Sequence, residues 1–417
     1  MPVSPRLRSA ISDSVGGLPR RFWWLWTSTL VNRLGGFVVT FLALYLTVDR
    51  GYSASYAGLV AALFGLGSAV AALAGGVLTD RLGRRPTLLA AQLGTAASTA
   101  ALGFMDGPVT IAVVAFLTGL ASNASRPAIA AMIADIVPAE HRVRAFALNY
   151  WAINIGFGVS AAAAGLIAAH GYLLLFLLDA LSTLVCAVLV FVKIPETRPE
   201  RGPADAAEQR IGLGTVLRDG PFMAVVGVTL LLALVYQQGS TTLAVDMGEH
   251  GISTTEFGLV ASLNGLLIVV LQLPLTKLME GRNRTALLVV SALLTGWGFG
   301  LTALAGSSAG FYAWTVAVWT IGEIVNAPTM MGLVSELSPT HARGRYQGVY
   351  SLSWSLASFV GPAAGGLLLD HAGSAAVWGA CAVAGTGAAL AFLGIGRIRR
   401  PAGAPAPAEQ PVAAVAP

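Results

Sequence analysis

Charge is scarce in this 417-residue sequence: Asp, Glu, Lys and Arg make up only 11% of it, whereas hydrophobic residues make up 55%. A soluble globular protein has about 25% charged residues, so a chain of this length with so little charge cannot cover the surface of soluble domains. Disorder is excluded for the bulk of the chain as well, because it requires low hydrophobicity and high charge. The remaining class, in agreement with a mean hydropathy of +0.73, is a polytopic membrane protein.

Cysteine is also rare, since the sequence has only Cys186 and Cys381, in separate apolar stretches. Two such thiols make neither a disulfide framework nor a metal site, so we expect both to pack inside helices and predict no bound metal. The phosphate-binding pattern GxxxxGK[ST] is absent, which argues against an intrinsic ATP motor. There is no HExxH motif, and no GxSxG motif with a partner histidine. We therefore expect neither an enzyme nor a cofactor.

What the sequence does contain is a series of apolar stretches of about 20 residues or more, the length that an α-helix needs to cross a bilayer. These stretches predict an all-α membrane protein with twelve transmembrane helices. The predicted spans are residues 22–48, 56–79, 86–105, 108–134, 144–169, 171–194, 221–247, 256–278, 284–305, 309–335, 344–369 and 373–396.

The basic residues predict the orientation of these spans, because Lys and Arg accumulate in cytoplasmic loops. With the N-terminus placed in the cytoplasm, all but three of the 25 basic residues fall on the cytoplasmic side. The exceptions are Arg50 in an outer loop, and Arg33 and Arg126 within spans. We expect a multi-pass protein of the cell membrane, the inner membrane in a bacterium with two membranes, with both termini in the cytoplasm. The basic residues are dispersed over short loops, so no nucleic-acid partner is predicted.

The two halves of the sequence resemble each other at an offset of about 200 residues. The stretch Gly58–Ala61 recurs as Gly258–Ala261, and Asp135 after the fourth span aligns with Glu336 after the tenth. Matched polar loop residues indicate a duplicated six-helix unit, which predicts two bundles related by a pseudo-two-fold axis. The predicted segments are a cytoplasmic N-terminus (1–21), an N-terminal six-helix bundle (22–194), a cytoplasmic linker (195–220), a C-terminal six-helix bundle (221–396) and a disordered cytoplasmic tail (397–417).

The loop between the second and third spans combines glycine, an acid and clustered arginines in the sequence GVLTDRLGRR. We expect Arg84 or Arg85 to pair with Asp135 and to form a gate at the cytoplasmic side. The pattern resembles the loop signature of the major facilitator superfamily, and with the repeat the resemblance covers residues 20–396. It implies that Asp80 contacts the eleventh helix and stabilises the outward-facing state. The motif residues are Gly76, Asp80, Arg81, Gly83, Arg84, Arg85 and Asp135.

A second resemblance concerns the pattern GPxxGG, which drug/proton antiporters of that superfamily carry in the fifth span. In this sequence the pattern lies in the eleventh span, as Gly361, Pro362, Gly365 and Gly366. The fifth span keeps only small residues, ending at Gly165, and therefore departs from the antiporter pattern. Small residues allow helix backbones to approach closely in either span. The chain is most similar to the twelve-helix drug and metabolite efflux group.

Four ionisable residues stand out inside predicted spans, where a charge is costly and therefore marks a functional candidate: Arg33, Arg126, Asp179 and Glu323. Burial favours the neutral form of a carboxyl group, so Glu323 is the first candidate for proton coupling and Asp179 the second. The alternative for Glu323 is a structural hydrogen bond or ion pair, and for Asp179 we favour a structural pair or cap. The resemblance implies that spans one, four, seven and ten line a central cavity. The cavity candidates are Arg33, Phe37, Phe41, Tyr45, Ser122, Arg126, Tyr236, Gln237, Thr241, Trp319, Asn326 and Met330.

These features predict a secondary transporter that works by alternating access and is driven by the proton motive force. The favoured substrate is a small amphipathic organic compound, a drug or a metabolite, moved by export. The alternative is a proton symporter or facilitator that takes up a sugar, an organic acid or a peptide. The predicted partners are the substrate, protons and the lipid bilayer, and we expect a monomer.

Overall fold

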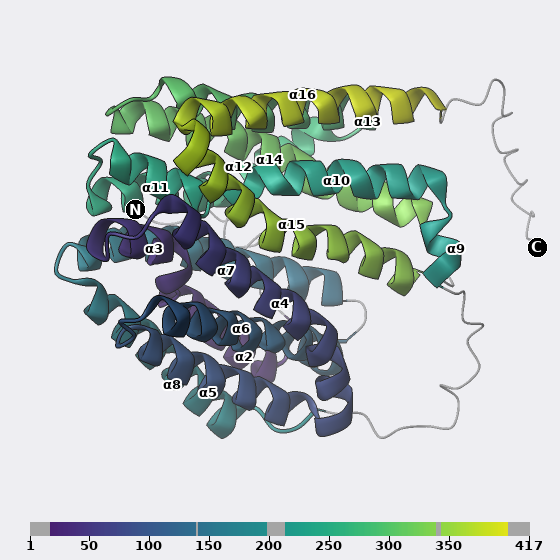
Figure 1. Ribbon diagram of the computed structural model, residues 1–417. Coiled ribbons are helices and arrows are strands. Elements are labelled where there is room, and N and C mark those ends of the chain that lie inside the picture. Colours follow the sequence, from purple (N-terminus) through teal and green to yellow (C-terminus); the bar gives the residue numbers. More distant parts are fainter. Residues whose placement is uncertain (1–16, 139–140, 198–212, 339–342, 399–417) are drawn as a thin grey trace, which may run out of the picture.

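The computed structural model describes residues 17–138, 141–197, 213–338 and 343–398, and these residues form helices and connecting turns without any strand. Figure 1 shows two helical bundles side by side, with α2 to α8 in one and α10 to α16 in the other. The N-terminal bundle contains α2 (Arg20–Leu34), α3 (Val38–Leu44), η1 (Tyr45–Asp49), α4 (Ala54–Leu82), α5 (Arg84–Leu102), α6 (Pro108–Ile136), α7 (Arg142–Ala168) and α8 (Tyr172–Lys193). The C-terminal bundle contains α10 (Gly220–Gln238), α11 (Thr242–Glu249), α12 (Thr254–Met279), α13 (Arg284–Gly300), η4 (Leu301–Leu304), α14 (Ala309–Leu337), α15 (Arg343–Ala372) and α16 (Ser374–Ile398), and is preceded by the short α9 (Leu213–Leu217).

Helices occupy all twelve predicted span positions in the described part of the chain. The first and seventh spans are interrupted: α2 gives way to α3 at Gly35–Gly36, and α10 gives way to α11 after Gly239. Ten of the helical segments are long and apolar enough to cross a membrane. The other two, α5 and α14, carry polar residues such as Gln92 and Glu323 that lower their hydropathy. The count of twelve crossings therefore stays a prediction.

Equivalent helices in the two bundles begin in the same way. Ser53 caps α4 by accepting a hydrogen bond from the Tyr56 N–H, and Ser253 caps α12 by accepting one from the Glu256 N–H. Two residues before each serine, Gly51 and Gly251 adopt φ angles of 67° and 76°, a left-handed conformation that favours glycine. The predicted repeat is thus visible at the level of single caps and turns.

The two bundles meet along two pairs of helices, α4 with α15 and α7 with α12. Glycines allow both close approaches. A methyl group on Gly58 of α4 would lie 3.2 Å from the Cα of Gly366 in α15, and one on Gly258 of α12 would lie 2.8 Å from the Cα of Gly165 in α7. Gly58 and Gly258 are equivalent in the repeat, as are Gly165 and Gly366, so the interface has the two-fold character of the sequence.

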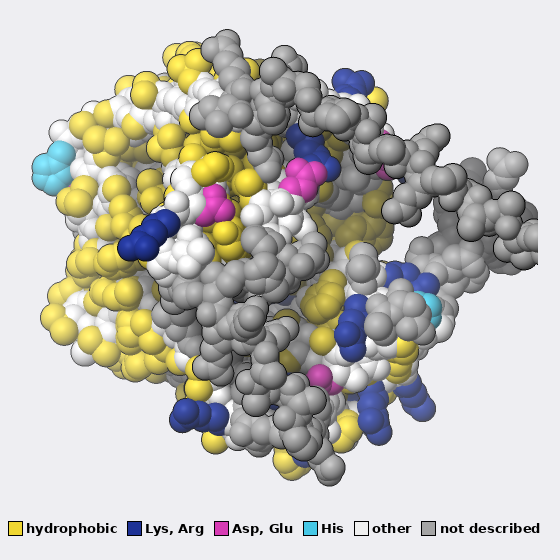
Figure 2. All heavy atoms as spheres, turned by 90° about the vertical axis from the view of Figure 1, so that its right-hand side faces the viewer, with side chains coloured by type: hydrophobic (Ala, Val, Ile, Leu, Met, Phe, Trp, Pro, Cys, Tyr) yellow, Lys and Arg dark blue, Asp and Glu magenta, His cyan; other side chains and the backbone are white. Residues whose placement is uncertain are grey.

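The two ends of the bundles differ in charge and in the contacts between the halves. At the end where α4 and α12 finish, here called the linker end, Lys and Arg side chains surround the face shown in Figure 2. At the opposite end, here called the far end, α3 packs against α11. There the Asp370 carboxylate on α15 accepts hydrogen bonds from the N–H groups of Ala54 (3.1 Å) and Ser55 (2.7 Å) on α4. The halves are therefore tied together at the far end.

A loop at the far end is held by its own ion pair. Arg50 contacts Asp106 at 2.7 Å, between the first and third spans. The hydrogen bond from Arg50 to this carboxylate raises the pKa of the guanidinium, so the pair stays charged over the physiological range. Arg50 is the single basic residue that the orientation prediction places on the outer side.

Candidate functional site

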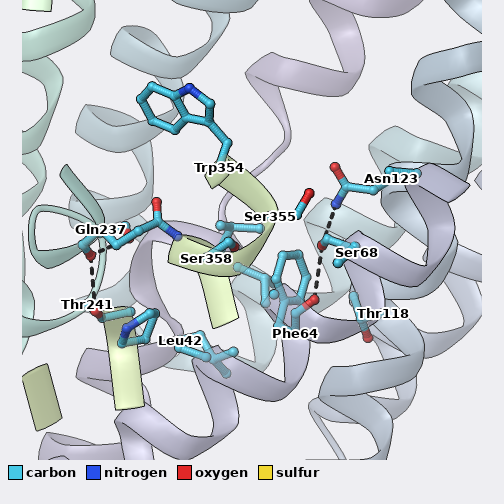
Figure 3. Close-up of a pocket in the computed structure, with 18 of the residues that line it drawn as sticks. Leu42, Phe64, Ser68, Thr118, Asn123, Gln237, Thr241, Trp354, Ser355 and Ser358 are labelled. Carbon is cyan, nitrogen blue, oxygen red and sulfur yellow. Dashed lines mark hydrogen bonds between the residues drawn. The ribbon is translucent and has the colours of Figure 1, made fainter. Parts of the chain in front are cut away.

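A cavity of about 660 Å³ lies between the two halves and is here called the central cavity. Its walls come from α3, α4 and α6 on one side, and from the α10–α11 break and α15 on the other. Figure 3 shows that apolar side chains such as Leu42 and Trp354 alternate there with the hydroxyl and amide groups of Ser358, Gln237 and Thr241. The surface is amphipathic, which suits a ligand with both apolar and hydrogen-bonding parts.

Hydrogen bonds within and between helices hold the polar groups of the central cavity in place. Asn123 on α6 donates from Nδ2 to the Ser68 hydroxyl on α4 at 2.7 Å, and Ser68 donates to the Phe64 carbonyl at 3.0 Å. On the opposite wall, Thr241 donates to the Gln237 carbonyl at 3.3 Å, across the break in the seventh span. The Gln237 side chain lines the cavity.

A second cavity of about 450 Å³ lies inside the N-terminal bundle and is here called the arginine cavity. Arg33 of α2 and Arg126 of α6 both line it, together with polar side chains that include Asn32, Thr95 and Asn149. Arg126 also lines the central cavity, so the two cavities adjoin at α6. Arg126 lies deep within the bundle and yet is accessible, because its surroundings are cavity walls instead of packed helices.

Neither cavity arginine has an ion-pair partner within the described residues. Asp179, the candidate acid on α8, does not form an ion pair with either of them in that part of the chain. The Asp179 carboxylate instead accepts a hydrogen bond from the Val38 N–H at 3.0 Å. This bond caps the start of α3, where the break at Gly35–Gly36 leaves backbone N–H groups without helical partners. Asp179 therefore holds the interrupted first span together.

Glu323 lies on α14, outside the walls of both cavities. Its Oε2 accepts a hydrogen bond from Asn264 Nδ2 of α12 at 2.9 Å, and the same amide nitrogen donates to Thr320 at 3.1 Å. Helix α12, which carries Asn264, packs against α7 of the N-terminal bundle. The Glu323 carboxylate is therefore bonded to a helix of the interface between the two halves.

The predicted cavity residues divide into two groups. Those that line a cavity are Arg33, Ser122, Arg126, Gln237 and Thr241. Those that line neither cavity, and instead face packed interior, are Phe37, Phe41, Tyr45, Tyr236, Trp319, Asn326 and Met330.

Two physical causes explain the second group. The first span is not one continuous helix, so the spacing that puts Arg33, Phe37 and Tyr45 on one face does not hold across Gly35–Gly36. Tyr45 packs edge-on against Phe176 with ring centroids 5.0 Å apart. On α14, the face chosen from the sequence turns toward its own bundle.

The packing on α14 shows where that face points. Trp319 stacks on Phe299 with ring centroids 4.9 Å apart, and Asn326 donates to the Ser291 hydroxyl at 3.1 Å. Met330 packs in a buried apolar cluster. Tyr236 of α10 hydrogen-bonds Thr295 at 2.9 Å and stacks on Trp354. Only this last contact reaches a residue of the central cavity wall.

The loop motif lies at the linker end of α4 and α5. Of the two arginines expected near Asp135, Arg84 makes the ion pair, at 3.1 Å. The Glu196 carboxylate accepts hydrogen bonds from the N–H groups of Arg84 and Arg85 and so caps α5. The Arg85 guanidinium lies over the ring of Phe191.

The rest of the loop motif is placed only in part. Gly83 joins α4 to α5 with a φ of 107°, directly after Arg81 and Leu82, which end α4. Gly76 and Asp80 lie within α4, but their side chains fall outside the described residues. The second half repeats the motif's ion pair, since Arg284 pairs with Glu336, the residue equivalent to Asp135.

The GPxxGG residues of the eleventh span provide close contacts. Gly361 and Gly365 face Gln237 and Gln238 of α10, and Gly366 faces α4. Pro362 lines the central cavity. This motif therefore lets α15 pack against both halves at once.

One intramembrane acid was missed by the sequence prediction. Asp246 on α11 is fully buried and accepts hydrogen bonds from the Tyr312 hydroxyl (2.7 Å) and from Trp378 Nε1 (3.2 Å). His250 Nδ1 lies 3.7 Å from its other carboxylate oxygen. The signal was present, because Asp246 falls inside the predicted span 221–247.

Comparisons with known proteins agree with this architecture. The sequence matches the family described as Major Facilitator Superfamily over residues 25–362 and 240–417. It is 28% identical over 360 residues to the uncharacterized MFS-type transporter YhjO of Bacillus subtilis (strain 168), covering 85% of this chain and 87% of the relative. It is 26% identical over 356 residues to the multidrug resistance protein MdtH of Aeromonas salmonicida (strain A449), covering 84% and 88%. Its fold is similar to that of a POT family transporter solved with 5-aminolevulinic acid, with a TM-score of 0.76 at 15% identity, covering 93% and 98%.

Proposed function

Because the chain belongs to the Major Facilitator Superfamily, whose members similar to it are transporters and not enzymes, we propose that it is a proton-coupled secondary transporter. It moves a small amphipathic organic compound through the central cavity by alternating access, and we favour export as the direction of transport. The observation that carries this proposal is the central cavity itself. It lies between two repeat-related bundles that touch through glycine contacts.

Alternating access requires that the halves open at one end while they close at the other. Hydrogen bonds between the halves within the described residues lie at the far end, at Asp370 and at the Thr255–Gly165 contact. The glycine pairs of α4–α15 and α7–α12 act as pivots, because two backbones in direct contact roll over each other without interlocked side chains. This arrangement supports a state that is closed at the far end.

Proton coupling is assigned to Glu323. A carboxylate accepts hydrogen bonds only, whereas a protonated carboxyl group also donates one. Protonation of Glu323 therefore changes its hydrogen bond with Asn264 of α12. Helix α12 packs against α7 of the other half, so this change occurs at the interface between the halves. Asp179 is the weaker candidate, because the backbone of α3 uses its carboxylate.

Export of an amphipathic compound is supported by the mixed walls of the central cavity and by the similarity to MdtH, which is named a multidrug resistance protein. The second candidate function is uptake by proton symport, with an organic acid as substrate. It is favoured by Arg33 and Arg126, which line the arginine cavity without an ion-pair partner among the residues that the structure describes, and by the absence of the antiporter pattern from the fifth span.

The basic rim at the linker end supports a cytoplasmic position for that end, for both termini and for the segment between the bundles. We propose that the protein lies in the cell membrane and works as a monomer.

A flux assay tests the coupling. The purified chain is reconstituted into liposomes that contain the pH indicator pyranine, and ethidium, benzenesulfonate or xylose is added under an imposed pH gradient. We expect at least one compound to move protons through the wild type, and Glu323→Gln to lose that movement by at least tenfold while it still binds the compound. Glu280→Gln, on an exposed loop, is the matched control and should behave as wild type. Equal proton movement in Glu323→Gln would remove the assignment of Glu323. The direction of proton movement relative to the compound separates export from uptake.

A further inference from the structure

The arginine cavity is a site with uncompensated positive charge. Arg33 and Arg126 line it from facing helices, and neither contacts a carboxylate within ion-pairing distance among the residues that the structure describes. A charge inside a membrane protein is costly unless a partner or water compensates for it. Two such charges in one cavity favour the binding of an anion.

The packing of α7 fixes the base of the Arg33 side chain. A methyl group on Gly156 of α7 would collide with the Arg33 Cβ, so α7 packs directly against the stem of that side chain. Pro127 follows Arg126 within α6 and faces the central cavity. Cavity positions with supporting backbone contacts of this kind are typical of binding sites.

We propose that the arginine cavity binds the anionic group of the transported compound, so that the substrates are amphipathic organic anions. This inference rests on the proposed transport function and names its substrate class. Guanidinium groups match the geometry of carboxylate, sulfonate and phosphate oxygens through paired N–H donors. The hydroxyl groups of Thr95, Ser122 and Ser125 lie on the same walls but donate to carbonyls of their own helices, so the guanidinium groups are the donors that the anion would use.

The position of Arg126 explains why the anion would belong to an organic compound. Arg126 and Ala130 line both cavities, so a compound whose anionic group contacts Arg126 extends its apolar part into the central cavity. There it meets Leu42, Phe64 and Trp354. The two volumes, about 450 and 660 Å³, each fall in the range of small-molecule sites. An inorganic anion would use the arginines and leave the apolar wall without a role.

Binding to the purified full chain tests the inference without any flux measurement. Thermal unfolding is recorded with benzenesulfonate, which stays ionised at all working pH values, and with benzenesulfonamide, its neutral counterpart of similar shape. Inorganic phosphate and chloride are run at the same ionic strength. We expect saturable stabilisation of the wild type by benzenesulfonate, and an affinity at least tenfold lower for the other three compounds.

The variants identify the site. Arg33→Gln and Arg126→Gln should each weaken benzenesulfonate binding at least tenfold, whereas Arg126→Lys keeps a measurable part of it. Without ligand, the two glutamine variants should melt at the wild-type temperature or above it, since an unpaired charge is removed; a purely structural arginine would give a lower melting temperature. Arg282→Gln, at an exposed position of the linker end, should change neither quantity.

Three results would overturn the inference. Benzenesulfonate could stabilise the glutamine variants as it does the wild type, phosphate or chloride could bind as tightly through the same arginines, or benzenesulfonamide could bind as tightly as benzenesulfonate. If a glutamine variant does not fold, the lysine variant and the four-compound comparison on wild type still decide the outcome. Proton-coupled movement of ethidium alone in the flux assay would leave the proposed transport function standing while this substrate class fails.

Discussion

At the residue scale, the ionisable groups in the spans fall into two kinds. Asp179 and Asp246 have hydrogen-bond partners within the protein. Asp179 caps α3, and Asp246 accepts hydrogen bonds from Tyr312 and Trp378. Arg33 and Arg126 face cavities without an ionic partner among the described residues. Sequence position alone does not separate these kinds, because the sequence does not show whether a distant helix supplies a hydrogen-bond or ion-pair partner for a charge inside the membrane. The distinction comes from contacts between residues far apart in the chain.

Loss of a hydrogen bond to the Asp246 carboxylate should lower the free energy of unfolding by a measurable amount. Tyr312→Phe removes one of two hydrogen bonds to a fully buried carboxylate, and a hydrogen bond to a charged group contributes about 1.5–3 kcal/mol. We expect Tyr312→Phe to lower the unfolding free energy of the protein in detergent by about that amount. Tyr52→Phe is the matched control, because its hydroxyl bonds an exposed carbonyl at 3.2 Å, and it should cost under about 0.5 kcal/mol. Equal effects of the two substitutions would argue against a buried Asp246 network.

At the element scale, hydropathy located the helices but not their interruptions. Apolar length predicted spans 22–48 and 221–247 as single helices, whereas the chain breaks at Gly35–Gly36 and after Gly239. Adjacent glycines were a visible signal for the first break, since glycine weakens a helix interior. The acid that caps the resumed helix lies 141 residues away in sequence, and no local pattern could have predicted that pairing. For this reason Arg33 lines the arginine cavity, whereas the aromatic residues Phe37, Phe41 and Tyr45 line neither of the two cavities.

The glycine contacts between α4 and α15 predict the effect of added bulk. Gly58→Leu places a side chain against the Pro362 carbonyl and the Gly366 backbone, and backbone atoms cannot move aside as a flexible side chain can. We expect destabilisation of about 1–3 kcal/mol and at least a tenfold loss of transport, measured by thermal unfolding and by flux.

Gly227→Leu on α10 is the control for this change, because nothing lies within 4 Å of its added Cβ. It should keep wild-type stability and flux. Normal transport by Gly58→Leu would contradict a pivot at this contact.

At the scale of the whole molecule, the duplication organises the structure. The cap at Ser53 recurs at Ser253, and the ion pair of Arg84 with Asp135 recurs as Arg284 with Glu336. The sequence predicted two related bundles because such anchors are local and survive in both copies. The resemblance implied the contact of the second span with the eleventh, but the sequence could not predict that the arginine cavity lies within one bundle, since this depends on how distant segments pack.

If the two bundles rock about their glycine contacts, the distance between them must change at both ends of the molecule, and these two distances can be measured. Spin labels are placed at Leu82→Cys and Leu278→Cys at the linker end, and in a second sample at Val109→Cys and Leu304→Cys at the far end. All four sites are exposed, and the native Cys186 and Cys381 are buried. Double electron–electron resonance is recorded in liposomes across a pH series, with and without benzenesulfonate or ethidium. We expect the distance between the two linker-end labels to shorten under the conditions in which the distance between the two far-end labels lengthens. Two distances that stay fixed during active transport, or that change in the same sense, would contradict it.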